Sequence, residues 1–181
     1  MRILGLRPRL SGSGAAFWTK SECTGTITST TAKKGDIGAS LTGFRNTLFL
    51  WIGPASPRPV DQVVCCKWSS GDATEAYCIQ IEMIGVARQV CSQFNVPFVV
   101  VDKSSALKEV AGAARAPKSV SENDRSKWIS KQLRAGCLSR GFPVKNDTIA
   151  EAFAAVELFR SRLHPDCPSS SAGPLFAGAA A

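Results

Sequence analysis

Four charged residues lie where predicted strands end or where the last predicted helix begins, so their side chains could form one site. Arg7 follows the apolar run "ILGL", and Lys67 follows the run "VVCC". Asp147 and Glu151 are four residues apart in "KNDTIAEAF", so on a helix they share one face. Two acids and two bases of this kind could bind a cation through the acids or form ion pairs with one another.

The order of the predicted elements brings these residues to one edge of a sheet. Apolar runs, turn signals and helical periodicity predict five strands and five helices. The strands are expected at 1–6, 15–18, 23–31, 63–66 and 98–101, and the helices at 37–52, 73–94, 104–110, 123–133 and 146–163. A three-strand meander followed by strands that alternate with helices indicates an α/β fold of the ribonuclease H type, a mixed five-stranded sheet with flanking helices. Ligands of such sheets collect at the carboxyl ends of the central strands.

The composition predicts one globular domain with a polyanionic partner. The chain has 181 residues, of which 44% are hydrophobic, and a net charge of +8. This length suits a single domain, expected at 1–163, and residues 164–181 form a low-complexity tail expected to be disordered. Nucleic acid is the first partner that the charge suggests and an anionic membrane the second, although a generic basic protein has the same balance. No apolar stretch is long enough to span a bilayer.

The cysteines and the single histidine limit the chemistry. Seven cysteines, none in a CxxC pair, indicate buried thiols in the cytoplasm or another reducing compartment. His164 is the only histidine, which argues against a zinc site and against a Ser-His or Cys-His nucleophile.

A basic stripe is predicted on one helix. Lys127, Lys131 and Arg134 are three or four residues apart, so they share a face that suits backbone phosphates. An ordinary solvated helix would show the same spacing. Trp18 and Trp128 are expected in the core.

Four stretches, in order, resemble the RuvC-like family of Holliday junction resolvases. "MRILGLRPRLSGSGAAF" is similar to the family's first hairpin, and "DQVVCCKW" to its fourth strand. "SSALKEVAGAARAPKS" is similar to a segment with two spaced lysines, and "KNDTIAEAFAAVELF" to the last helix. Together they span most of residues 1–163. The resemblance implies an endonuclease that cleaves branched DNA with Mg²⁺ or Mn²⁺ bound by four carboxylates, and commonly a homodimer.

The sequence departs from the family pattern at the acids themselves. Arg7 and Lys67 occupy the first-strand and fourth-strand acid positions, and Arg9 replaces a glycine. Glu151 stands where the final acid belongs, with Asp147 one turn before it, so these two would be the remnant catalytic and metal-binding acids. Because two cations replace two carboxylates, we expect metal to bind poorly and Arg7 and Lys67 to pair with Asp147 and Glu151.

Each of these residues also has a purely structural alternative. Arg7 could be a solvated arginine at a strand end, and Lys67 a surface lysine in a loop. Asp147 could cap the last helix, and Glu151 could be one more charge on a solvated helix face.

The resemblance also implies a nucleic-acid surface. Lys108 and Lys118 match the two spaced lysines, and Arg115 lies between them among small residues. Trp68 follows the fourth strand, where it could stack on an unpaired base or cover the core.

Three functions follow from these observations. The first is a protein that binds branched or structured DNA with impaired or absent cleavage, with RNA as a further possible ligand. The second is an active endonuclease with substitute acids, for which Asp36, Asp72 and Glu75 are candidates. The third is a structural or assembly protein that reuses the fold.

Overall fold

The computed structural model describes residues 1–9, 11–28, 36–56, 59–67 and 74–163. The predicted tail at 164–181 lies outside this part of the chain. None of the helices within it is long and apolar enough to cross a membrane.

A five-stranded mixed sheet forms the centre of the molecule, in the order β3-β2-β1-β4-β5. β1 pairs antiparallel with β2 and parallel with β4, while β2–β3 is antiparallel and β4–β5 is parallel. The strands are β1 (Ile3–Arg7), β2 (Gly14–Trp18), β3 (Cys23–Ile27), β4 (Gln62–Lys67) and β5 (Phe98–Asp102). This arrangement confirms the predicted ribonuclease H-like sheet.

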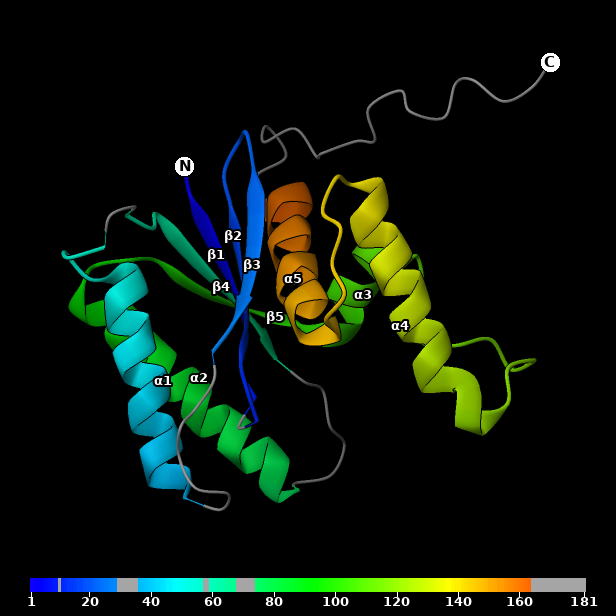
Figure 1. The fold of residues 1–181 in the computed structure, drawn as a ribbon, viewed down its shortest axis with the longest axis horizontal. Coiled ribbons are helices and arrows are strands. Elements are labelled where there is room, and N and C mark those ends of the chain that lie inside the picture. Colours follow the sequence, from blue (N-terminus) through cyan, green and yellow to red (C-terminus); the bar gives the residue numbers. More distant parts are fainter. Residues whose placement is uncertain (10, 29–35, 57–58, 68–73, 164–181) are drawn as a thin grey trace.

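Five helices cover the two faces of the sheet (Figure 1). α1 and α2 lie on one face, and α3, α4 and α5 lie on the other, so the sheet separates two apolar cores. The helices are α1 (Ile37–Ile52), α2 (Glu75–Gln93), α3 (Lys103–Ala111), α4 (Glu122–Ser139) and α5 (Asp147–Leu163). The apolar face of α2 lies in the core that it shares with α1, and the predicted homodimer stays a prediction.

Most helices begin where a side chain caps the first turn. Asp36 accepts a hydrogen bond from the amide of Ala39 at 2.8 Å, as expected for an N-cap of α1. Asp102 caps α3 in the same way, which ends β5 and turns the chain directly into the helix. Lys103 therefore begins a helix at the carboxyl end of a strand.

α4 is longer than predicted, and one of its tryptophans is placed differently. The helix continues to Ser139 through Gly136, where an added Cβ would lie 2.0 Å from the carbonyl oxygen of Val110. The glycine is thus the close-packing point of α4 against α3 rather than a helix end. Trp128 is half-buried and outside both cores, so its predicted core position is wrong, whereas Trp18 is buried.

α5 packs directly against the sheet because glycines in the strands leave room for its backbone. A Cβ on Gly5 of β1 would lie 2.3 Å from the carbonyl oxygen of Ala152, and one on Gly14 of β2 would lie 2.4 Å from that of Thr148. Alanines also occupy much of the buried surface of α5. This close approach brings the first turns of α5 to the end of β1.

We predict that Gly5→Ala destabilises the fold, because the added methyl group collides with the backbone of α5. Overpacking of this kind costs about 1–3 kcal/mol, measured as the free energy of unfolding in urea. Gly85→Ala is the matched control, since Gly85 is exposed in α2 and nothing lies within 4 Å of its added Cβ. The control should stabilise the protein by about 0.5–1 kcal/mol; equal effects of the two substitutions would contradict the close packing.

Candidate charged site at the carboxyl ends of the strands

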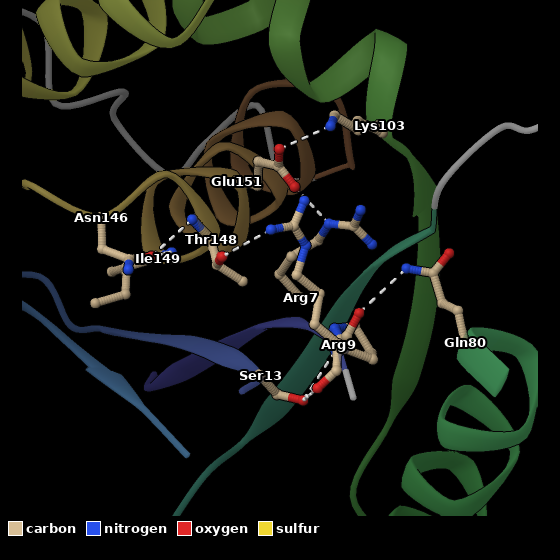
Figure 2. Close-up of polar contacts among 10 residues, drawn as sticks. Arg7, Arg9, Ser13, Gln80, Lys103, Asn146, Thr148, Ile149 and Glu151 are labelled. Carbon is tan, nitrogen blue, oxygen red and sulfur yellow. Dashed lines mark hydrogen bonds and ion pairs between the residues drawn. The ribbon is translucent and has the colours of Figure 1, made fainter. Parts of the chain in front are cut away.

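Glu151 is the centre of a charged cluster that joins β1, β5 and α5 (Figure 2). Nε of Arg7 donates a hydrogen bond to Oε2 of Glu151, and Nζ of Lys103 lies 2.7 Å from Oε1. The side chain of Arg7 is 0% exposed and that of Glu151 is 8% exposed, so this ion pair is inside the protein. The expected pairing of Arg7 with Glu151 is therefore present, and neither residue is solvated.

The fold explains why these three residues meet. Arg7 is the last residue of β1, and Lys103 follows the last residue of β5. Because β1, β4 and β5 are parallel, their carboxyl ends lie at the same edge of the sheet. Glu151 reaches that edge from the second turn of α5.

The charges around Glu151 keep it ionised. Burial by itself raises the pKa of this carboxyl group, but the positive charges of Lys103 and Arg7 and their hydrogen bonds outweigh burial. The net result is a pKa below the ordinary value of 4.5. Glu151 is thus a buried carboxylate with a cation on each oxygen.

Lys67 does not take the predicted part in this cluster. Its ammonium group lies 5.9 Å from the ring centroid of Tyr77, and the ion-pair partners of Glu151 are Arg7 and Lys103. The expectation that Lys67 pairs with a remnant acid is therefore wrong. Lys103 holds that position because β5 ends one residue later than predicted and α3 follows at once.

Asp147 belongs to a separate contact between α4 and α5. Its carboxylate accepts hydrogen bonds of 2.7 Å from Nε of Arg134 and from Oγ of Ser130. Burial raises its pKa, but these hydrogen bonds and the charge of Arg134 outweigh burial and hold the pKa below its usual range. Asp147 therefore pairs with neither Arg7 nor Lys67. It is not the helix cap either, because Oδ1 of Asn146 accepts the amide hydrogen bond of Thr148 at 2.8 Å.

These residues do not fit a divalent metal ion. Mg²⁺ and Mn²⁺ favour sites where several carboxylates gather, but Glu151 is paired with Arg7 and Lys103, and Asp147 with Arg134, so positive charges stand where the metal would bind. Within the described residues, no group of three or more His, Cys, Asp or Glu side chains could hold a metal. Of the candidate substitute acids, Asp36 caps α1, Glu75 begins α2, and Asp72 lies outside the described residues.

The predicted basic residues are on the surface formed by α3, α4 and the segment between them. Lys108, Arg115 and Lys118 are exposed, as are Lys127 and Lys131 on α4. Arg134 is also exposed but is bound to Asp147. Trp68 lies outside the described residues. We call this surface the α3–α4 basic face.

A second buried ion network was not predicted. Glu157 on α5 pairs with Arg160 one turn later, and Nε of Arg140 lies 3.6 Å from its other carboxylate oxygen. Arg140 also donates a hydrogen bond of 2.7 Å to the carbonyl of Glu109, which ties α4 to α3. The guanidinium carbon of Arg160 lies 3.9 Å from the Trp18 ring centroid. The only sequence signal was a Glu–Arg pair at helical spacing within the apolar stretch "AAVELFR".

The thiols within the described residues are free and mostly unreactive. Cys65, Cys66, Cys91 and Cys137 are buried, whereas Cys78 is exposed. Burial raises the pKa of the Cys66 thiol to about 12, so it stays protonated and is a poor nucleophile.

We predict that the stability provided by Glu151 is lost in acid. The pKa of Glu151 is lower in the folded protein than in the unfolded chain, so its contribution is complete above pH 4.5 and decreases as the pH falls below that value. Urea unfolding at a series of pH values should therefore show wild type and Glu151→Gln converging in acid. Asp147 is present in both proteins, so its contribution to the pH dependence cancels in the comparison. A difference in the free energy of unfolding that stays constant down to about pH 3 would contradict the ionised pair.

We also predict that Arg7 and Glu151 are strongly coupled. Arg7→Met leaves a buried carboxylate with one partner fewer and should cost about 3–5 kcal/mol in the free energy of unfolding. The double variant Arg7→Met/Glu151→Met should recover most of that loss, because the side chain of Lys103 is 19% exposed and reaches water. Arg125→Ala is the control, since its pair with Glu122 is exposed and should change stability by less than about 0.5 kcal/mol. Additive effects of Arg7→Met and Glu151→Met would refute the coupling.

Comparison with known proteins identifies the fold. No protein-family model matches the sequence, and no match is found among curated proteins. The structure is similar to that of Thermus thermophilus RuvC, with a TM-score of 0.62 and 14% sequence identity, over 90% of this chain and 96% of the other. It is similar as well to T. thermophilus RuvC in complex with a Holliday junction substrate, with a TM-score of 0.63, 13% identity and the same coverage. The chain has the ribonuclease H-like fold of RuvC.

Proposed function

We propose that this protein binds branched or structured DNA through the α3–α4 basic face and does not cleave it by a metal-dependent reaction. The observation that carries the proposal is the cluster in which Arg7 and Lys103 occupy both oxygens of Glu151. The other two functions considered, an endonuclease with substitute acids and an assembly protein, are outcomes of the experiment below.

The electrostatics of the cluster oppose metal binding. A divalent cation near Glu151 would stand beside two positive charges that are already bound to it. Two unit charges 4 Å apart repel by about 4 kcal/mol at the effective dielectric of a protein surface, and a divalent ion doubles this. Arg7 is wholly buried, so it cannot turn into solvent to make room. Without bound metal, the means of activating water for phosphodiester cleavage is absent.

The distribution of charge supports a nucleic-acid partner. Residues 103–145 contain ten Lys and Arg but three Asp and Glu, so they carry seven of the eight net positive charges of the chain. These residues are α3, α4 and their connections, all on the α5 side of the sheet (Figure 1). A concentrated basic face attracts the phosphate backbone and releases its counterions on binding.

The likeness to RuvC bound to a Holliday junction supports branched DNA as the ligand. The match extends over 96% of that RuvC chain, which supports a comparable use of the fold.

The experiment measures binding and cleavage on one substrate. A labelled four-way DNA junction is titrated at several salt concentrations, beside a linear duplex and a folded RNA, and then incubated with Mg²⁺ or Mn²⁺. We expect tight, salt-dependent binding to the junction and no product. Lys127→Ala/Lys131→Ala should lower the affinity and reduce the slope of log affinity against log salt by about 2.

Lys20→Ala is the matched control for this double variant. Lys20 is exposed in the β2–β3 connection, two residues after Trp18. Trp18 pairs with Ile3, at the opposite end of β1 from Arg7. Nicking of the junction that disappears in Glu151→Gln would replace the proposal with an active endonuclease. Absence of binding to any of the three nucleic acids would leave the assembly protein as the better account.

A further inference from the structure

Arg9 has an exposed side chain on a firmly anchored backbone. Its amide donates a hydrogen bond of 3.0 Å to Oγ of Ser13, and its carbonyl accepts one of 3.1 Å from the amide of Gly12. Nε2 of Gln80 on α2 donates to the carbonyl of Pro8 at 3.3 Å. Hydrogen bonds to Gln80 and Ser13 therefore fix the backbone at Pro8 and Arg9.

The guanidinium of Arg9 has most of its donors available. It makes one long hydrogen bond of 3.5 Å, from Nη1 to Oγ1 of Thr148 at the start of α5, and forms no ion pair within the described part of the chain. Figure 2 shows it reaching toward α5 on the side where Glu151 lies. An arginine carries five N–H donors, so this side chain can bind an anion through two of them without breaking its support.

The surroundings of Arg9 are positive. Arg7 and Lys103 both pair with Glu151, and Arg9 contacts Thr148 on the same helix. Among the described residues, Lys67 and Asp102 also lie at the ends of these strands, and Asp102 directly precedes Lys103 at the end of β5. Among the described residues at these strand ends, four cations (Arg7, Arg9, Lys67 and Lys103) stand against two carboxylates (Glu151 and Asp102). Asp147 pairs with Arg134, and it also interacts electrostatically with Arg9.

We infer that Arg9, with Lys103 behind it, binds a backbone phosphate of the nucleic acid at this edge of the sheet. The inference rests on the proposed function and extends it, because it adds a phosphate contact at the end of β1 to those of the α3–α4 basic face. Arg9 makes a bidentate contact with two phosphate oxygens, and Lys103 contributes charge while it remains bound to Glu151. A phosphodiester fits better than a peptide carboxylate, because the α3–α4 basic face lies on the same side of the sheet as α5, which Arg9 contacts (Figure 1).

The first test compares junction binding by Arg9→Ala, Arg9→Lys and the Lys20→Ala control. Arg9→Ala should weaken binding about tenfold and reduce the salt slope by about 1, because one phosphate contact is lost. Arg9→Lys should restore the salt slope but only part of the affinity, because an ammonium group does not match two phosphate oxygens. The thermal unfolding midpoints should be unchanged, since Arg9 is exposed.

The second test is independent of DNA. Inorganic phosphate is titrated into the ¹⁵N-labelled protein, and the Nε–Hε signal of Arg9 and the amide signal of Thr148 are followed by NMR. Both should shift in wild type, and the Thr148 shift should be lost in Arg9→Ala.

The outcomes separate the two proposals. If Arg9→Ala binds the junction as wild type does while Lys127→Ala/Lys131→Ala binds weakly, the phosphate site is wrong and the proposed function stands. If wild type binds no nucleic acid but phosphate shifts the Arg9 signal, the proposed function fails and the anion site remains, open to an acidic protein segment. If phosphate moves neither signal, the site does not exist.

Discussion

The contact between Arg7 and Glu151 depends on how closely α5 lies to the sheet. Glycines in β1 and β2 and alanines on α5 remove the side chains that would hold the two apart. The second turn of the helix then faces the last residue of β1, where the side chain of Glu151 is only 8% exposed. A carboxylate fixed there must have a cation, because the protein interior does not solvate it. Arg7 and Lys103 provide that charge. The close packing of α5 against the sheet therefore determines which side chains must surround Glu151.

Most of the fold follows from local patterns in the sequence. Apolar runs marked the strands, and the order of strands and helices was enough to give the sheet topology, because crossovers between parallel strands leave few alternatives. Helix ends were less predictable for particular reasons. Gly136 is a common signal for a helix end, but here it allows α4 to touch the backbone of α3. Asn146 and Asp147 are adjacent and cap helices equally well, and only the structure shows that Asn146 does so.

The sequence was enough to predict where the charged site lies, but it predicted only some of the residues that form it. Arg7 and Glu151 were placed by their elements, since strand ends and the last helix converge at one edge. Lys103 was missed because its position depends on the exact end of β5. The strand ends at Asp102, and α3 begins at the next residue without a loop. The network of Arg140, Glu157 and Arg160 depends on tertiary contacts between α4 and α5 that no local pattern records.

The charged site can be compared with the site of a metal-dependent nuclease. In a metal-dependent nuclease, a cation stands between protein carboxylates and the phosphate, and it both holds the phosphate and activates water. Here the guanidinium group of Arg7 and the ammonium group of Lys103 bind Glu151. Arg9 adds a further positive charge beside the start of α5. If Arg9 binds a phosphate as inferred, the order of carboxylate, cation and phosphate would be the same, but a side-chain cation has no open coordination position. Under the proposed function, such a site would attract the DNA backbone through its positive charge but would lack the bound metal that activates water.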